Sequence, residues 1–375
     1  MKRMQKFEKI TDYLFETTYD EYEQFFEEAR VKLLKYHPYM GGCSSVQRGS
    51  IRGRNYDWTY DEEPEFIVHV PANDKGRHAS VGVAVLTEIT AADVENGQRE
   101  DAYRTIPYYT LDGINDAGLC VNINVVGYKE KGEFEMKTEG FGDDICPVMV
   151  TRILLDGAGS IDEAVAMIDG MDIFSLGTVE EAHFMISGPQ SAKDSTYNTV
   201  VVGLVPDESR HYRVSVIDYN NGDFVDNKPI MTNFHLTGFD GSIESLTRHL
   251  MGYERYLILQ ENYEHGNSME GMMDLMKQVH YSKAYDLDSD NFWYSDFAEG
   301  ELDMTNRGES KLCGDLSRAG AYEEILGKAV GHFNRMERDA TIWRTVHTSV
   351  YDTDRKVLHI MPQESGKTYK FYLEG

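Results

Sequence analysis

Basic residues are scarce in this chain of 375 amino acids. It holds 37 lysine and arginine residues against 64 aspartate and glutamate residues, which gives a formal net charge of -27 at pH 7. Nucleic acids and anionic membrane surfaces are bound through basic patches. The charge balance therefore argues against both kinds of partner.

Cysteine is also scarce, with four residues at positions 43, 120, 146 and 313. None has the C-x-x-C spacing of zinc and redox motifs, and their wide scatter argues against a disulfide scaffold. We therefore expect reduced thiols and a cytoplasmic protein. None of the 12 histidines lies in an H-E-x-x-H motif, so the sequence does not support a metal centre.

Long apolar segments are missing. No run of 18 apolar residues occurs, so we expect no transmembrane helix. The basic start at residues 1–10 is followed by charged residues instead of the apolar core of a secretory signal. We expect neither membrane insertion nor secretion, and assembly into a homo-oligomer stays open.

Hydrophobic patterning divides the chain into two parts. Residues 1–42 contain an amphipathic helical pattern over 18–36, which His37-Pro38 ends. Length alone would allow two or three domains, but residues 43–375 contain no linker or internal repeat, and we interpret them as one α+β domain. The predicted strands are 44–48, 51–58, 65–70, 79–86, a hairpin over 108–126, 182–187, 199–205, 212–219, 343–351, 357–361 and 368–373; the predicted helices are 147–155, 161–168, 246–261 and 268–279.

Two glycines precede Cys43. Because glycine has no Cβ, the peptide bond between Gly42 and Cys43 is sterically open to attack. Self-cleavage there would make Cys43 a new N-terminus that carries both a thiol and a free α-amine. With unperturbed pKa values of about 7.7–8.0 for the amine and about 8.5 for the thiol, the amine can accept the thiol proton near neutral pH. Nucleophile and base would then come from one residue.

The sequence GGCSSV at 41–46, followed by GRNYDW at 53–58, resembles the start of the mature chain in cysteine-type N-terminal nucleophile (Ntn) hydrolases of linear amides. These include choloylglycine hydrolases, penicillin V acylases and acid ceramidase. Similar segments follow in family order at 112–119 (DGINDAGL), 231–234 (MTNF) and the alternating stretch 345–373.

This resemblance implies a four-layer αββα sandwich, in which two stacked antiparallel sheets are flanked by helices. It also favours a helical propeptide at 1–42, which covers the site until cleavage, over an ordinary N-terminal helix packed on the catalytic domain at 43–375.

Candidate catalytic roles follow from the same resemblance. Cys43 is the nucleophile, and Arg54 is the cation that favours its thiolate. Arg52 lies on the same strand face and is the substitute if the match is off by one step. Asp57 accepts hydrogen bonds from the α-amine of Cys43. The alternatives are a buried structural cysteine, an exposed strand arginine and a solvated turn carboxylate.

The oxyanion would be held by two donors. Asn233 resembles the family asparagine that donates its side-chain amide, and a turn asparagine is the alternative. The second donor falls at or next to Asn124. Of the two arginines that could complete the pattern, we prefer Arg248 in the Ser245-Leu246-Thr247-Arg248 run, with Arg255 as the rival. An acyl pocket or ordinary core packing would explain Tyr56, Trp58, Tyr108, Tyr109 and Phe234 equally well.

The resemblance implies a self-processing amidohydrolase that cleaves a linear C–N bond of a small N-acyl amide. Its chemistry is proton and acyl transfer by groups already present, so no cofactor is expected. An acyltransferase that passes the acyl group to an amine is the main alternative. A non-catalytic binding protein on the same fold would lack the nucleophile or the R-N-x-D run, and a papain-like enzyme would need a recognisable histidine motif.

Overall fold

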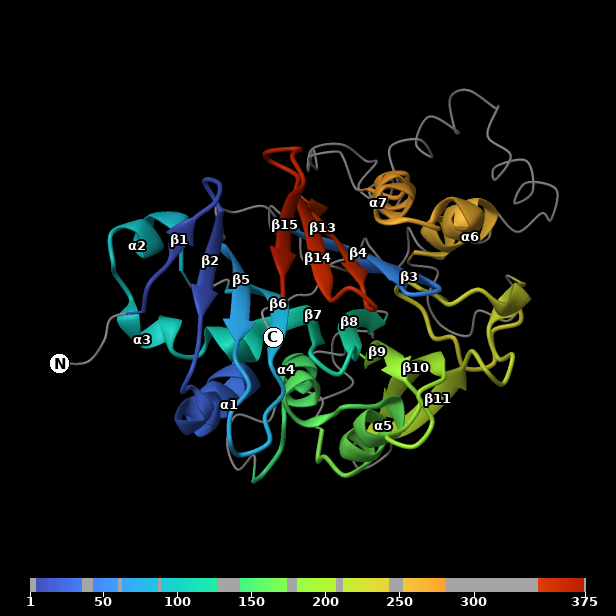
Figure 1. Ribbon diagram of the computed structural model, residues 1–375, viewed down its shortest axis with the longest axis horizontal. Helices are drawn as coiled ribbons and strands as arrows, with labels where there is room; N and C mark the ends of the chain where they lie inside the picture. Colours follow the sequence, from blue (N-terminus) through green and yellow to red (C-terminus); the bar gives the residue numbers. More distant parts are fainter. Residues whose placement is uncertain are drawn as a thin grey trace, which may run out of the picture.

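Two β-sheets stacked face to face form the centre of the molecule, and helices cover their outer faces (Figure 1). The computed structural model describes residues 5–35, 43–59, 63–86, 89–126, 142–173, 181–206, 212–242, 252–280 and 343–373. Within these ranges, no helix is long and apolar enough to cross a membrane.

The larger described sheet has nine strands. In spatial order they are β1 (Glu8–Lys9), β2 (Leu14–Thr18), β5 (Glu65–Val70), β6 (Ser80–Val85), β7 (Thr110–Asn115), β8 (Cys120–Val126), β9 (Glu181–Pro189), β10 (Tyr197–Pro206) and β11 (Tyr212–Asp218). β2 runs parallel to β5, and the other ladders described in this sheet are antiparallel.

The smaller sheet has six described strands, all paired antiparallel. Their spatial order is β12 (Ile230–Met231), β3 (Cys43–Arg48), β4 (Ile51–Thr59), β13 (Trp343–Asp352), β14 (Val357–Pro362) and β15 (Tyr369–Tyr372).

Helices close the sandwich on both sides (Figure 1). α1 (Phe26–Lys35), α4 (Pro147–Gly157) and α5 (Ile161–Asp169) cover the larger sheet, and α6 (Tyr253–Asn262) and α7 (Met269–Lys277) cover the smaller one. The predicted four-layer αββα arrangement is confirmed. The remaining described helical segments are short: α2 (Ala91–Glu95), α3 (Glu100–Tyr103), η1 (Glu23–Phe25), η2 (Ile106–Tyr109), η3 (Val225–Asn227) and η5 (Tyr263–His265).

Local sequence explains where the clearest helices begin and why one of them lies close to its sheet. Ser160 caps α5 by accepting from the Glu163 amide, and Ser268 caps α7 by accepting from the Gly271 amide. α7 packs closely on β4 because Gly53 has no side chain: a Cβ there would lie 2.6 Å from Cγ of Met276. Gly53 thus brings the helix layer against the strand that carries Arg54.

The N-terminal segment differs from its prediction. The helix expected over 18–36 begins only at Phe26, after the 3-10 turn η1 and the unpredicted strands β1 and β2. Tertiary contacts explain the difference. The Tyr19 amide donates to the His69 carbonyl at 2.9 Å, its hydroxyl donates to the Tyr103 carbonyl at 2.6 Å, and the Tyr22 hydroxyl donates to Asp156.

This segment is also part of the core. Leu14, Phe15, Tyr22 and Leu34 are at most 2% exposed, and β2 lies inside the larger sheet, between β1 and β5. Removal of residues 1–42 as a propeptide stays a prediction. The described part of the segment is built into the sandwich instead of lying over it as a separate helix.

Candidate active site

Cys43 opens β3 and lies between the two sheets. β3 pairs with β4 so that Cys43 is opposite Tyr56 and Ser45 is opposite Arg54. Paired residues of an antiparallel ladder point to the same face, so these four side chains share the face that packs on the larger sheet. The Cys43 side chain is buried there.

Arg54 lies against the thiol, as the motif predicts. Its Nη2 is 3.7 Å from Sγ of Cys43 and donates to the Ile123 carbonyl at 3.2 Å, and its Nη1 pairs with Asp112 at 2.5 Å. Burial raises the pKa of the Cys43 thiol, and the positive charge of Arg54 opposes that rise. The arginine therefore favours the thiolate inside a site that otherwise disfavours it.

Arg52 points elsewhere along the same face. Its guanidinium donates to Asn122, to the Met185 carbonyl and to Gln47. No contact with Cys43 is observed in the described structure. The alternative in which Arg52 replaces Arg54 therefore has no support from this geometry.

Asp57 contacts the site through its neighbours. One carboxylate oxygen accepts from Thr345 at 2.6 Å, and the other pairs with Arg255 at 2.9 Å. Burial raises the pKa of Asp57 to about 6, although Arg255 and Thr345 counteract this rise. The carboxylate makes no direct contact with the nitrogen of Cys43 here, whereas the Asp57 backbone amide supports the thiolate.

Asn233 is the residue that meets the Cys43 nitrogen. Its Oδ1 accepts from that nitrogen at 2.9 Å and from Arg255 at 2.6 Å, while its Nδ2 donates to the Val125 carbonyl at 2.7 Å. A side-chain amide nitrogen carries two hydrogens. One of them is therefore left to donate to a developing oxyanion beside Cys43.

Asn124 does not face the thiol. Its Oδ1 accepts from Ser45 and from Asn122, and its Nδ2 donates to the Met231 carbonyl at 3.2 Å. It therefore anchors the segment that leads to Asn233.

The neighbouring position, Val125, faces the site instead. The described ladder between β7 and β8 ends at the Asp112–Asn122 pair, and beyond it the Ile123 and Val125 carbonyls accept from Arg54 and Asn233. The amide and carbonyl of one strand residue point to the same side. The backbone N–H that points toward the site is thus that of Val125 or Ile123, the two neighbours of Asn124.

The structure also bears on the choice between the two arginines. Arg248 lies outside the described residues. Arg255, at the start of α6, is fully buried and links Asp57 to Asn233. Arg255, the alternative to Arg248 in the sequence analysis, is therefore present in the site.

Four further side chains join the site that the sequence did not single out for a role. They are Glu65, Asp112, Thr345 and His347, all at most 2% exposed. Asp112, Thr345 and His347 lie in segments that carry the resemblance, at 112–119 and 345–373, and Glu65 is a carboxylate at the start of the strand pattern EFIVHV at 65–70. Buried carboxylates need partners, but the pattern does not say which.

Of the aromatic residues expected near the acyl group, four are buried in the same apolar cluster as Cys43, namely Tyr56, Trp58, Tyr108 and Tyr109, and Phe234 lies in a second cluster. Trp58 stacks on Tyr56, with 6.3 Å between ring centroids, and Tyr56 is the ladder partner of Cys43. Tyr108 packs against Tyr22. Phe234 packs among Phe239 and the tyrosines of α6. Tyr109 is buried in the same cluster as Tyr108.

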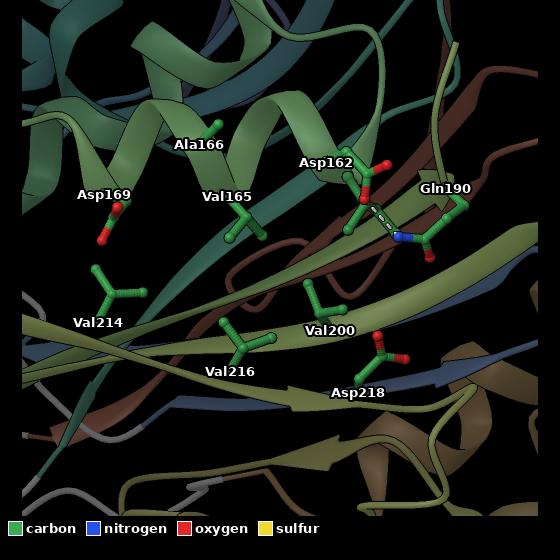
Figure 2. A pocket seen from close by; sticks show the side chains of 10 residues that line it. Asp162, Val165, Ala166, Asp169, Gln190, Val200, Val214, Val216 and Asp218 are labelled. Atoms are coloured by element: carbon green, nitrogen blue, oxygen red, sulfur yellow. Dashed lines mark hydrogen bonds between the residues drawn. The ribbon is translucent and has the colours of Figure 1, made fainter. Parts of the chain in front are cut away.

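A shallow groove of about 460 Å³ lies away from Cys43, between α5 and the strands β10 and β11 (Figure 2). Val200, Val214 and Val216 project into it from the strands, and Val165 projects into it from α5 (Figure 2). None of the candidate catalytic residues lines it. The lining residues are Ile161, Asp162, Val165, Ala166, Asp169, Gln190, Val200, Val214, Val216 and Asp218. Among the described residues, no cluster of histidine, cysteine, aspartate and glutamate has the arrangement of a metal site.

Comparisons with known proteins give distant structural similarities. No protein-family model and no curated protein matches the sequence. Penicillin V acylase from Agrobacterium tumefaciens is 12% identical, with a TM-score of 0.38, over 89% of this chain and 86% of its own. Two mutant forms of conjugated bile acid hydrolase from Clostridium perfringens are each 14% identical. They have TM-scores of 0.40 and 0.37, over 89% and 88% of this chain and 92% of their own.

Penicillin V acylases are among the proteins that the motifs around Cys43 resemble. The structural similarities are nevertheless too distant to carry a function. We infer the function from the side chains around Cys43.

Proposed function

We propose that this protein is a self-processing amide hydrolase that uses Cys43 as an N-terminal nucleophile. The observation that carries the proposal is the surroundings of one residue. The Cys43 thiol lies 3.7 Å from a guanidinium, and its nitrogen lies 2.9 Å from the side chain of Asn233. Thiol and nitrogen are thus each held by a separate buried partner.

The first reaction would act on the chain itself. Sγ of Cys43 attacks the carbonyl carbon of Gly42, the peptide C–N bond breaks, and the nitrogen takes up a proton as the thioester forms. Water then hydrolyses the thioester. The products are a carboxylate on Gly42 and a Cys43 with a free thiol and a free α-amine.

The second reaction would use the same thiol on an N-acyl substrate. The α-amine accepts the thiol proton, Sγ attacks the acyl carbon, and the resulting ammonium returns the proton to the departing amine. Asn233 and a backbone N–H of β8 donate to the oxyanion, a contribution of about 3–4 kcal/mol for one such donor. Water resolves the thioester and releases the acid.

The remaining side chains would hold these groups in place. Arg54 supports the thiolate, and Arg255 joins Asp57 to Asn233. The carboxylate of Asp57 offsets the positive charge of Arg255 at the position where an ammonium forms. A small N-acyl amide is the proposed substrate, and no protein or nucleic-acid partner is needed.

The test is amine release from a panel of N-acyl amides, which includes bile-acid conjugates, N-acyl amino acids, fatty N-acyl amines and penicillins. We expect Cys43→Ala to release no amine. The matched control is Cys120→Ala, because Cys120 is also buried and burial raises its pKa to about 11. Equal amine release by Cys43→Ala and the unmodified protein would refute the proposal.

A further inference from the structure

A β-bulge in β13 sends two side chains into the site from opposite faces of one strand. Thr345 is opposite Asp57 on the antiparallel strand β4, and His347 is opposite the adjacent residue Tyr56. Two steps along β13 thus match one step along β4, and Val346 is the extra residue of the bulge. Residues two apart on a regular strand share a face. The bulge separates them: Thr345 reaches Asp57, and His347 turns toward the larger sheet.

His347 lies between two carboxylates in the space between the sheets. Its Nδ1 is hydrogen-bonded to Glu65, and its Nε2 is 3.8 Å from Asp112. All three side chains are at most 2% exposed. Burial disfavours the charged imidazolium, but Glu65 and Asp112 outweigh it and raise the pKa of His347 to about 9. The ring is therefore positively charged at neutral pH.

Asp112 connects this histidine to the nucleophile. The same carboxylate pairs with Arg54 at 2.5 Å and accepts from the Tyr351 hydroxyl. Arg54 in turn reaches Sγ of Cys43 at 3.7 Å. A continuous row of buried groups therefore leads from Glu65 on β5 to the thiol on β3.

We infer that the His347–Glu65 pair is a positioning device for the nucleophile, which acts through Asp112 and Arg54. With a charged His347 beside it, Asp112 does not depend on Arg54 alone for neutralisation. Asp112 then cancels less of the positive charge of Arg54, and the electrostatic potential at the Cys43 thiolate is more positive. A buried ion pair is a poor source of stability in itself, so its place beside this arginine favours a functional role. The inference deepens the proposed function and rests on it.

Several titratable or charged groups face His347 or the row of buried groups that leads from it to Cys43. They are Glu65 on β5, Asp112 on β7, Arg54, Tyr56 and Asp57 on β4, Tyr351 on β13 and Cys43 on β3. Tyr56 contacts the histidine ring with 5.4 Å between ring centroids.

The test is a pH titration of the Cys43 thiolate by its ultraviolet absorbance, taken as the difference between each protein and the same protein with Cys43→Ala. In His347→Gln we expect the pKa of the thiol to rise by about one unit. At any pH below the thiol pKa of both proteins, the variant then has about tenfold less thiolate. In the double variant Glu65→Gln/His347→Gln, which leaves no unpaired carboxylate at Glu65, the pKa should also rise.

The matched control is His280→Gln. His280 is a buried histidine that bonds Thr348 on the other face of β13, and burial lowers its pKa to about 4, so it is neutral at neutral pH. Its replacement should leave the thiol pKa unchanged. A purely structural histidine would alter stability without moving that pKa.

An unchanged thiol pKa in folded His347→Gln and in the folded double variant would overturn the inference. Failure of the double variant to fold, with His280→Gln folded, would also contradict it, because the pair would then be structural. The titration does not depend on hydrolysis. A shifted pKa in a protein that releases no amine would refute the proposed function alone, and amine release with an unshifted pKa would refute the inference alone.

Discussion

Replacement of Arg255 by methionine should damage both the fold and the reaction, because this arginine is a fully buried partner of two site residues. Its Nη1 pairs with Asp57 at 2.9 Å and its Nη2 donates to Asn233 at 2.6 Å. Removing one partner of a buried pair leaves an uncompensated charge and costs about 3–5 kcal/mol. We therefore expect Arg255→Met to lower the free energy of unfolding by that amount at neutral pH.

The double variant Arg255→Met/Asp57→Asn separates the cost of the buried Asp57 charge from the other effects of losing Arg255. In Arg255→Met/Asp57→Asn the carboxylate is gone, so the loss should be smaller than the sum of the two single losses, with a coupling of about 1–3 kcal/mol. Arg255 also lowers the pKa of Asp57, which lies at about 6 in its presence. Without the arginine that pKa should rise toward neutrality, and the single variant should lose amine release at neutral pH.

The assay is urea unfolding followed by tryptophan fluorescence, since Trp58 lies on the strand that carries Asp57. The control is Arg248→Met, the other arginine that the sequence motifs favour. A larger loss in Arg248→Met than in Arg255→Met, or strictly additive losses in the double variant, would refute this account of the buried pair.

Three further outcomes are expected. The pKa of His347 lies at about 9 against an ordinary 6.5, so the part of the folding free energy that depends on its protonation is fully present below pH 6.5 and is lost as pH rises through about 9; urea midpoints across this range should fall less in His347→Gln. After self-cleavage, residues 1–42 should stay bound, because β2 is an internal strand of the larger sheet; native size exclusion that separates the fragment from a still folded and active chain would contradict this. Asn233→Ala should lower kcat per folded molecule by about 10²–10³ and should also lower Tm, because it removes a buried hydrogen-bond partner of Arg255 and of the Val125 carbonyl; unchanged kcat per folded molecule in steady-state kinetics would contradict the oxyanion role.

Local signals predicted those parts of the fold that depend on neighbouring residues. The helices predicted at 161–168 and 268–279 begin within one residue of α5 and α7, whose first turns are capped by Ser160 and Ser268. The tight connection at residues 49–50 fixes the register of β3 and β4, and this register brings Arg54 to the Cys43 thiol, the neighbour that the resemblance implies. The helix predicted from Thr18 was wrong at its start, because contacts of Tyr19 with distant backbone decide that segment.

Contacts between residues far apart in the sequence are the part of the site that could not be predicted. His347 and Glu65 are 282 residues apart in the sequence, and no spacing rule connects them. The second oxyanion donor could be predicted only as Asn124 or one of its neighbours, since successive backbone N–H groups of a strand point to opposite sides. Asn124 therefore lies in an amide cluster, and the backbone of Val125 faces the site.

Intact-mass spectrometry of the purified protein tests most directly the claim that Cys43 is an N-terminal nucleophile. We predict a chain that begins at Cys43 in the unmodified protein and a full-length chain in Cys43→Ala, with amine release confined to the cleaved form. A catalytically active protein that keeps residues 1–42 on the same polypeptide would contradict the claim.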